Sequence, residues 1–142
     1  MFFTLFLVAF VSATLWPMAS EVVFVGLVSQ NPDAVWWLLL IATLGNSAGA
    51  WLMYECAGWF SQWTQQKLSA RREAFDYWLP KVRTFGPLAM LLAWLPLIGD
   101  LLPIAGGLLK TRRLPTVLCL TLGKGARYAI LAGAYLGYDR LV

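Results

Sequence analysis

The chain has 142 residues, about the length of one domain, and 60% of them are hydrophobic while only 13% are charged. It contains no histidine, and its two cysteines lie in apolar stretches without metal-ligand spacing. These features exclude histidine-based catalysis and histidine-ligated zinc, so we expect no enzyme activity, no metal and no cofactor. We expect no nucleic-acid binding despite the net charge of +4, because the basic residues flank the apolar runs.

Four long runs are almost free of charge, and each exceeds the roughly 18–20 residues needed to cross a membrane. They cover residues 2–30, 35–59, 86–109 and 115–138. The sequence therefore predicts an all-α integral membrane protein in which residues 1–142 form a single membrane domain.

The first run is interrupted near its middle by "WPMASE" at 16–21, which contains Pro17. Proline breaks a helix because it lacks a backbone N–H and clashes with the preceding turn. The arm after the break, 21–29, begins with Glu21 and is about 14 Å long, whereas the membrane core is about 30 Å thick. This arm reaches about halfway, which predicts a re-entrant helical hairpin that enters the membrane and leaves on the same side.

The second run, 35–59, is uninterrupted and is predicted to cross the membrane as one helix. Gly45 and Gly49 are spaced so that another helix can approach this span closely. In the connection that follows, 60–85, aromatic residues and leucines recur at near-helical spacing, with Lys67, Arg71 and Arg72 between them. That pattern predicts an amphipathic helix on an anionic membrane surface, and a solvated linker with aromatic anchors is the alternative.

The third run repeats the pattern of the first, because "LPLIGD" at 95–100 brings Pro96, Gly99 and Asp100 together near its middle. The arm at 100–109 is about 15 Å long, which predicts a second re-entrant hairpin. The last run, 115–138, is predicted to be a full span. It carries Lys124 and Arg127 on one helical face, about halfway along its length.

The positions of lysine and arginine separate the alternative topologies. Four straight crossings would leave six of these residues on one face of the membrane and three on the other. With two hairpins and two full spans, residues 60–85 and 110–114 share a face that holds eight of them, and Arg140 alone lies opposite. Six full crossings would give the same distribution, but the arms are too short for that. We therefore expect both basic connections to be cytoplasmic and both termini to lie on the other side.

The two halves also match each other in sequence. Pro17 and Glu21 correspond to Pro96 and Asp100 at an offset of 79 residues, and "TLG" at 43–45 corresponds to "TLG" at 121–123. This match predicts an inverted repeat, 1–59 and 86–142, joined by the connection at 60–85, although short matches also arise by chance in apolar sequence. Inverted repeats with discontinuous helices are typical of secondary transporters.

A charge in the middle of a membrane costs about 2.5–3.5 kcal/mol unless it is paired or hydrated. Glu21 and Asp100 are therefore expected to neutralise Lys124 and Arg127. One interpretation is a static network that locks the hairpins to the last span. The other is a substrate and proton pathway, in which protonation of Glu21 or Asp100 frees the cations and the half-helix ends to hold an anionic head group.

Two segments carry a resemblance to a known family. "PMASEVVFVG" at 17–26, with Pro17, Ser20 and Glu21, resembles the Pro-x-Pro-Ser-Glu-Val-Val segment of the DedA family, also called the VTT or SNARE-associated Golgi protein superfamily. "LGNSAGAWLMYECAG" at 44–58 is similar to the glycine-rich span that follows in that family, and "LPLIGDLLPIAGGLLK" at 95–110 is similar to its short YqaA-like branch.

The resemblance implies a multi-pass protein of the bacterial inner membrane with two re-entrant hairpins and periplasmic termini. It also implies membrane lipids, with undecaprenyl phosphate among them, and protons as partners, and it leaves a homo-oligomer open. By motif position, Glu21 corresponds to the essential hairpin acid of the family. The chain departs from the pattern at Ala19, which replaces a proline, and at Ala93 and Gly99, where arginines are expected. A phosphate site built on those arginines is not carried over, and Lys124 and Arg127 are the candidates to replace them.

The sequence thus predicts a transporter or flippase-like protein that moves an anionic lipid or a small solute, with proton coupling as a further hypothesis, and that supports membrane homeostasis. The alternative is a non-transporting membrane protein that supports envelope integrity or assembly.

Overall fold

The computed structural model describes residues 1–14, 19–59, 72–95 and 98–141. Within these ranges every regular element is a helix, which confirms the all-α class for the described part of the chain. In chain order the elements are α1 (Phe2–Thr14), α2 (Ala19–Gln30), η1 (Pro32–Ala34), α3 (Val35–Trp59), α5 (Arg72–Phe85), η3 (Gly86–Trp94), α6 (Leu101–Leu108) and α7 (Arg113–Asp139).

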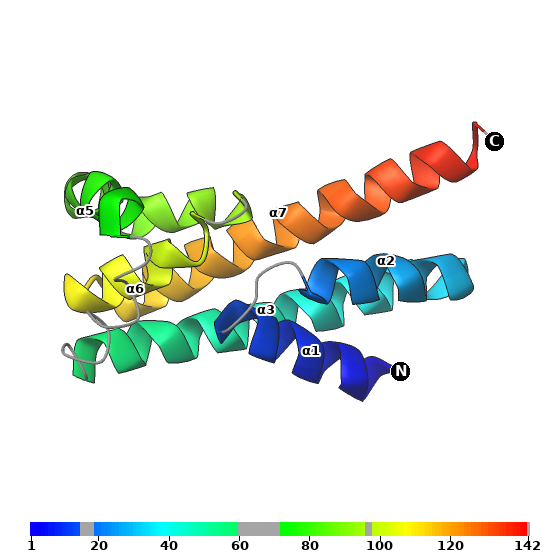
Figure 1. The fold of residues 1–142 in the computed structure, drawn as a ribbon, viewed down its shortest axis with the longest axis horizontal. Helices are drawn as coiled ribbons and strands as arrows, with labels where there is room; N and C mark the ends of the chain where they lie inside the picture. The colour runs from blue at the N-terminus through cyan, green and yellow to red at the C-terminus, as the bar shows by residue number, and fades with distance from the viewer. Residues whose placement is uncertain (15–18, 60–71, 96–97, 142) are drawn as a thin grey trace.

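The helices α3 and α7 form the long axis of the molecule and run in opposite directions (Figure 1). They contain 25 and 27 residues, which corresponds to lengths of about 37–40 Å and is enough to cross a membrane core of about 30 Å. Among the described residues, the helical stretches Pro32–Trp59 and Arg113–Asp139 are long and apolar enough to span a membrane. They coincide with the two runs that the sequence predicts to be full spans.

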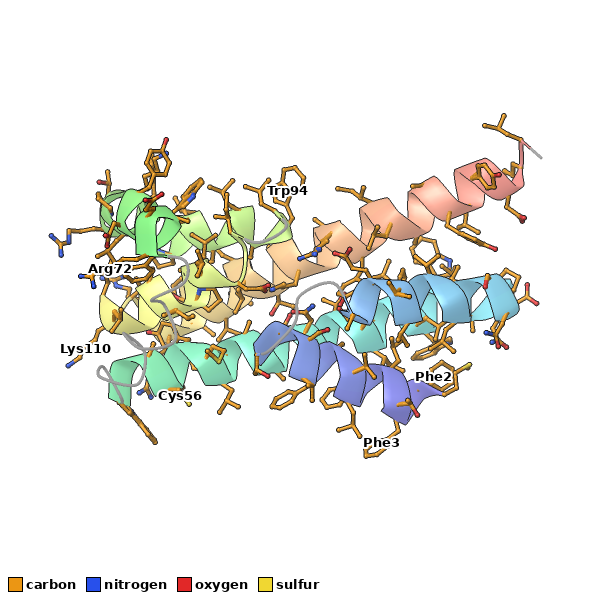
Figure 2. The ribbon with its side chains drawn as sticks, in the orientation of Figure 1. Phe2, Phe3, Cys56, Arg72, Trp94 and Lys110 are labelled. Carbon is orange, nitrogen blue, oxygen red and sulfur yellow. The ribbon has the colours of Figure 1, made fainter. Side chains whose placement is uncertain are left out.

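The outer surface of the molecule is strongly apolar. Trp36 and Trp37 at one end of α3 and Trp59 at its other end are exposed by 76%, 62% and 75%. Tryptophan concentrates at the boundaries between membrane and water, so its occurrence at both ends of α3 fits a membrane span. Phe3 on α1 also points away from the other helices (Figure 2) and is 74% exposed. This surface is suited to contact with lipid chains.

The helices α1 and α2 lie along the half of α3 that is nearer the chain termini (Figure 1). Gly45 and Gly49 face α1, where an added Cβ would collide with the carbonyl oxygens of Phe6 and Phe10, respectively. The two glycines therefore let α1 approach the backbone of α3 directly. Pro17 lies outside the described residues.

The elements α5, η3 and α6 occupy the opposite half of the long axis (Figure 1). The helix α5 is amphipathic, since it buries Phe75 and Val82 while Arg72 is exposed and lies 3.8 Å from Asp76. Gly86 joins α5 to η3 with a φ of 59°, a conformation that glycine adopts without steric strain. The remainder of the predicted amphipathic connection, with Lys67 and Arg71, lies outside the described residues.

The two pairs of short helices, α1–α2 and η3–α6, differ in geometry. The element η3 is a 3-10 helix of nine residues and α6 has eight residues, whereas α1 and α2 are α-helices of 13 and 12 residues. Long 3-10 helices are uncommon because their hydrogen bonds are poorer and their side chains eclipse. At Gly123 of α7, an added Cβ would press on the carbonyl oxygens of Met90 and Leu91, so this glycine allows η3 to approach α7 closely.

Buried apolar side chains form two separate clusters. One contains Leu5, Phe24 and Leu38 near the chain termini, and the other contains Met53, Met90 and Leu102 at the opposite half. The helix α3 contributes Ala42 to the first cluster and Ala50 to the second. The residues of α3 between these positions therefore lie where neither cluster fills the interior, and this is the place of the polar site.

Candidate functional site

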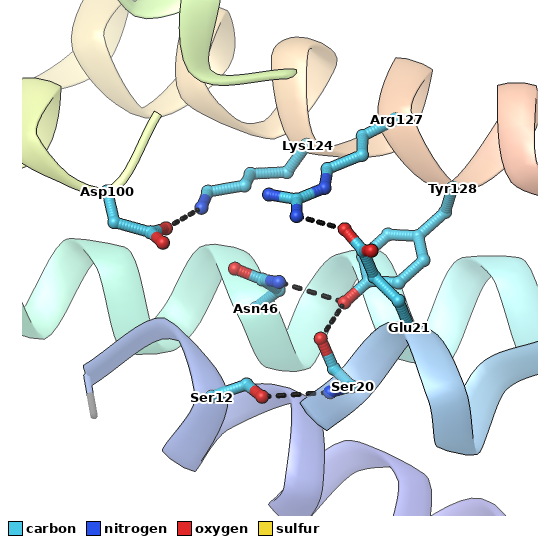
Figure 3. Close-up of polar contacts among 8 residues, drawn as sticks. All are labelled: Ser12, Ser20, Glu21, Asn46, Asp100, Lys124, Arg127 and Tyr128. Carbon is cyan, nitrogen blue, oxygen red and sulfur yellow. Dashed lines mark hydrogen bonds and ion pairs between the residues drawn. The ribbon is translucent and has the colours of Figure 1, made fainter. Parts of the chain in front are cut away.

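Two acidic residues lie at the starts of the short helices α2 and α6. Glu21 belongs to the first turn of α2, and Asp100 immediately precedes α6 at its N-cap position. The Asp100 side chain makes no capping hydrogen bond and instead reaches α7 (Figure 3). A direct bond to a buried cation is stronger than the attraction of one short helix for an anion.

The helix α7 supplies the cations for both acids. Lys124 Nζ lies 2.6 Å from Asp100 Oδ1, and Arg127 Nη2 pairs with Glu21 Oε1 (Figure 3). The lysine side chain is completely buried and the arginine is 7% exposed, whereas the aspartate and glutamate are 12% and 21% exposed. Since Lys124 and Arg127 are one helical turn apart, a single face of α7 receives both short helical pairs.

A chain of hydrogen bonds connects four helices beside the ion pairs (Figure 3). Asn46 Nδ2 of α3 donates to the Tyr128 hydroxyl of α7 at 2.8 Å, and that hydroxyl donates to Ser20 Oγ of α2 at 2.8 Å. The Ser20 N–H donates in turn to Ser12 Oγ of α1 at 2.9 Å. Tyr128 and Ser20 are completely buried, so this chain of bonds is shielded from solvent.

Several buried polar atoms around the same centre have no hydrogen-bond partner. On α3 these atoms are Thr43 Oγ1, Asn46 Oδ1 and Ser47 Oγ, and across from them are Asp100 Oδ2 and Arg127 Nη1. Buried polar atoms in folded proteins are nearly always bonded to protein, water or a ligand. A cluster of exceptions at one place is therefore unusual, and it marks the region between α3 and α7 as a candidate site for a polar ligand.

The arrangement makes the centre electrically neutral while keeping donors available. Each buried cation is balanced by one carboxylate, which removes most of the cost of placing charge in a membrane. A group that competes for Lys124 or Arg127 must carry negative charge and must accept several hydrogen bonds, as a phosphate does.

The structure places the other predicted residues in different ways. Ser20 belongs to the hydrogen-bonded chain next to Glu21. At Gly99, an added Cβ would collide with the carbonyl oxygens of Ala93 and Leu95, so glycine allows the tight turn that precedes Asp100. Pro96 lies outside the described residues.

Sequence reasoning missed Asn46, Tyr128 and Ser12. A usable signal was present for the first, because Thr43, Asn46 and Ser47 form a polar stripe on one face of an otherwise apolar span. No local pattern could have identified the other two. Tyr128 and Ser12 owe their roles to contacts between helices that are distant in the sequence.

Glu55 lies near the end of α3. Its carboxylate lies 3.5 Å from Arg113 Nη2 at the start of α7, away from the two central ion pairs.

Comparison with known proteins identifies close relatives. The chain is 38% identical over 132 residues to the inner membrane protein YqaA of Escherichia coli, an alignment that covers 93% of this chain and 89% of the relative. The protein of the same name from Shigella flexneri matches equally well, and an uncharacterized protein of Haemophilus influenzae is 35% identical over 135 residues. No family model and no solved structure matches the chain.

The relatives named as inner membrane proteins agree with the two helices that could span a membrane. The alignment extends over nearly the full length of both chains. The chain belongs to the YqaA family of inner membrane proteins.

Proposed function

We propose that this protein moves an anionic lipid across the inner membrane, and that Lys124 and Arg127 bind the phosphate of its head group. The observation that carries the proposal is the pair of buried cations on one face of α7, beside polar atoms that have no partner. Ionisable residues within a membrane are rare because they are costly, and they commonly mark a substrate or proton pathway.

The proposal includes α1–α2 and η3–α6 as re-entrant hairpins, with α3 and α7 as the full spans. The helices α2 and α6 contain 12 and eight residues, which gives lengths of about 18 and 12 Å against a core of about 30 Å. Non-helical backbone at membrane depth is tolerated only where protein or a watery cavity surrounds it. The contacts of Glu21 and Asp100 with α7 supply such surroundings for the residues that follow each break.

An inverted repeat accounts for the order of the elements. In each half a short helical pair precedes a long helix, and the two long helices run in opposite directions (Figure 1). Both chain ends point toward one end of the long axis, while α5 and the turn before α7 lie at the other. We propose that residues 60–85 and 110–114 are cytoplasmic, that both termini are periplasmic, and that the YqaA family is a short branch of the DedA superfamily.

Proton binding provides a mechanism for the exchange of partners. Protonation of Asp100 removes the negative charge that balances Lys124, and protonation of Glu21 does the same for Arg127. The cation released in this way attracts the lipid phosphate. When the carboxylate loses its proton, it competes with the phosphate again, so proton movement and head-group release are linked.

A groove beside α1 favours a lipid over a small solute. It has a volume of about 250 Å³ and is lined by Leu7, Val8, Val11, Ser12 and Ala19, which makes it almost entirely apolar. Ser12 lies in this groove and also accepts the hydrogen bond from the Ser20 N–H, so the groove adjoins the polar centre. A polyprenyl or acyl chain would fill the groove while its head group reached the cations.

The test is lipid movement in proteoliposomes that contain the purified protein. Labelled undecaprenyl phosphate is compared with a labelled phospholipid at two pH values. We expect selective, pH-dependent movement that Glu21→Gln and Asp100→Asn abolish, while Asp33→Asn, which changes an exposed acid, leaves it intact. Absence of movement of either lipid by folded, inserted protein would refute the proposal.

The alternative is a non-transporting protein that supports envelope integrity. The observation that favours it is that both central acids are already paired, as a static lock between helices requires. In that case Glu21→Gln and Asp100→Asn would affect cells only as far as they lower the abundance of the folded protein. Measuring abundance and activity of each variant together separates the two functions.

A further inference from the structure

A polar pocket lies at the end of the molecule where α3 stops and α7 starts, away from the central ion pairs. Its volume is about 300 Å³. The helix α3 lines it with Tyr54, Glu55 and Trp59, and the turn from α6 into α7 lines it with Lys110, Thr111 and Arg113. Figure 2 shows Lys110 at this end of the molecule, with its side chain directed outward.

The backbone at Lys110 is unusual. Its φ of 50° is the one left-handed value among the described non-glycine residues. The turn is of the type that ends many helices, with the Lys110 N–H bonded to the Gly107 carbonyl at 3.2 Å and the Thr111 N–H bonded to the Gly106 carbonyl at 3.1 Å. Glycine is the usual residue at the left-handed position of this turn, because a side chain there is strained. Strained residues of this kind are more frequent at functional sites, so Lys110 is a candidate ligand-binding residue.

The walls of the pocket are held in place by packing between α3 and the turn. The Tyr54 hydroxyl donates to the Thr111 carbonyl at 2.5 Å, and the ring of Tyr54 stacks on Trp51 with centroids 4.6 Å apart. An added Cβ at Gly107 would collide with the Tyr54 carbonyl, so the glycine allows the two backbones to meet. The walls of the pocket are therefore formed by closely packed segments of α3 and the turn.

Charges of both signs surround the pocket. Lys110 and Arg113 are exposed, and Arg113 is the first residue of α7, so the dipole of that helix adds to the attraction of Arg113 for an anion. Arg113 Nη2 is 3.5 Å from Glu55 Oε2, but the arginine side chain is 70% exposed, which makes this a weak pair. A ligand with one negative and one positive group can therefore bind the two cations and the carboxylate together.

The position of the pocket along α3 indicates which kind of ligand it can meet. Trp59 is 75% exposed at the end of the candidate span Pro32–Trp59, and tryptophan favours the boundary between membrane and water. Phospholipid head groups lie at that depth.

We infer that this pocket binds the head group of a phospholipid that carries both a phosphodiester and an ammonium group, such as an ethanolamine head group. Lys110 and Arg113 bind the phosphate, and Glu55 binds the ammonium next to the ring of Trp59. Binding at this site does not require lipid movement through the centre, so this inference and the proposed function are tested independently.

The test measures lipid binding to the delipidated full chain in detergent by native mass spectrometry. Phosphatidylethanolamine is compared with phosphatidylglycerol, which has the phosphate but no ammonium. We expect phosphatidylethanolamine to bind about fivefold to tenfold more tightly, as expected for one additional charge-assisted contact at a partly exposed site. Water-soluble phosphoethanolamine is added as a competitor, which shows whether the head group alone is enough or whether the lipid chains are also needed.

Three variants assign the contacts. Lys110→Gly should weaken binding of both lipids, and it should not lower thermal stability because glycine suits the left-handed backbone. Glu55→Gln should remove the preference for phosphatidylethanolamine without weakening the binding of phosphatidylglycerol. Arg72→Gln, which removes an exposed cation on α5, is the matched control and should change neither. The inference is overturned if the Lys110→Gly variant binds both lipids as tightly as the Arg72→Gln variant does. It is also overturned if the Glu55→Gln variant still prefers phosphatidylethanolamine.

Discussion

The pair between Asp100 and Lys124 offers the sharpest test of how the centre is stabilised. The ammonium is completely buried and bonded at 2.6 Å to a carboxylate that is 12% exposed. Asp100→Asn keeps the shape of the side chain and leaves the lysine charge without its counter-ion. Removing one partner of a buried pair costs about 3–5 kcal/mol, and we expect about 3 kcal/mol here because the amide oxygen of asparagine still accepts a hydrogen bond.

A double-mutant cycle separates this pair from the rest of the site. Lys124→Met removes the ammonium and should also destabilise the protein, since Asp100 Oδ2 already lacks a partner and Oδ1 would lose its own. The double variant Asp100→Asn/Lys124→Met leaves no unpaired charge, so its stability should lie within about 1 kcal/mol of the native protein. The resulting coupling energy is about 3 kcal/mol or more.

The assay is unfolding by sodium dodecyl sulfate in mixed micelles, followed by tryptophan fluorescence, because the chain has eight tryptophans. The cycle on Arg72 and Asp76 is the control, since this pair is 3.8 Å apart with side chains that are 80% and 63% exposed. Its coupling energy should be below about 0.5 kcal/mol. Small, additive effects of Asp100→Asn and Lys124→Met would refute the reasoning, because they would mean that the lysine is hydrated or uncharged.

Three further predictions concern packing, hydrogen bonding and topology. Gly45→Ala should destabilise the protein by about 1–3 kcal/mol, because its Cβ meets the backbone of α1, whereas Gly26→Ala has nothing within 4 Å and should be neutral or slightly stabilising in the same unfolding assay. Tyr128→Phe removes a buried hydroxyl that bonds to two helices and should cost about 1–2 kcal/mol; an unchanged unfolding midpoint would contradict the hydrogen-bonded chain. In a chain whose two native cysteines are replaced, Arg112→Cys should react with a membrane-impermeant thiol reagent only from the cytoplasmic side and Arg140→Cys only from the periplasmic side, and labelling of both from one side would exclude the proposed topology.

The class of the protein and its two long helices could be predicted from the sequence, because they depend on local properties. Uninterrupted apolar length predicts the stretches that could cross a membrane, and the structure has helices at both of the predicted places. Charged residues within apolar runs are costly, so Glu21, Asp100, Lys124 and Arg127 could be selected as candidates from position alone. The shapes of the short helices were less predictable, since η3 is a 3-10 helix and α6 has only eight residues.

The pairing of the charges depended on the tertiary structure. Glu21 lies 106 positions from Arg127 in the sequence and Asp100 lies 24 from Lys124, so only the packing of α2 and the turn before α6 against α7 decides which acid meets which base. The same packing brings Asn46, Tyr128 and Ser20 together and closes the pocket beside Lys110. The sequence by itself determined which residues could not remain alone in a membrane, because the cost of burying charge is local. Their partners were decided by contacts between distant helices, which local patterns do not contain.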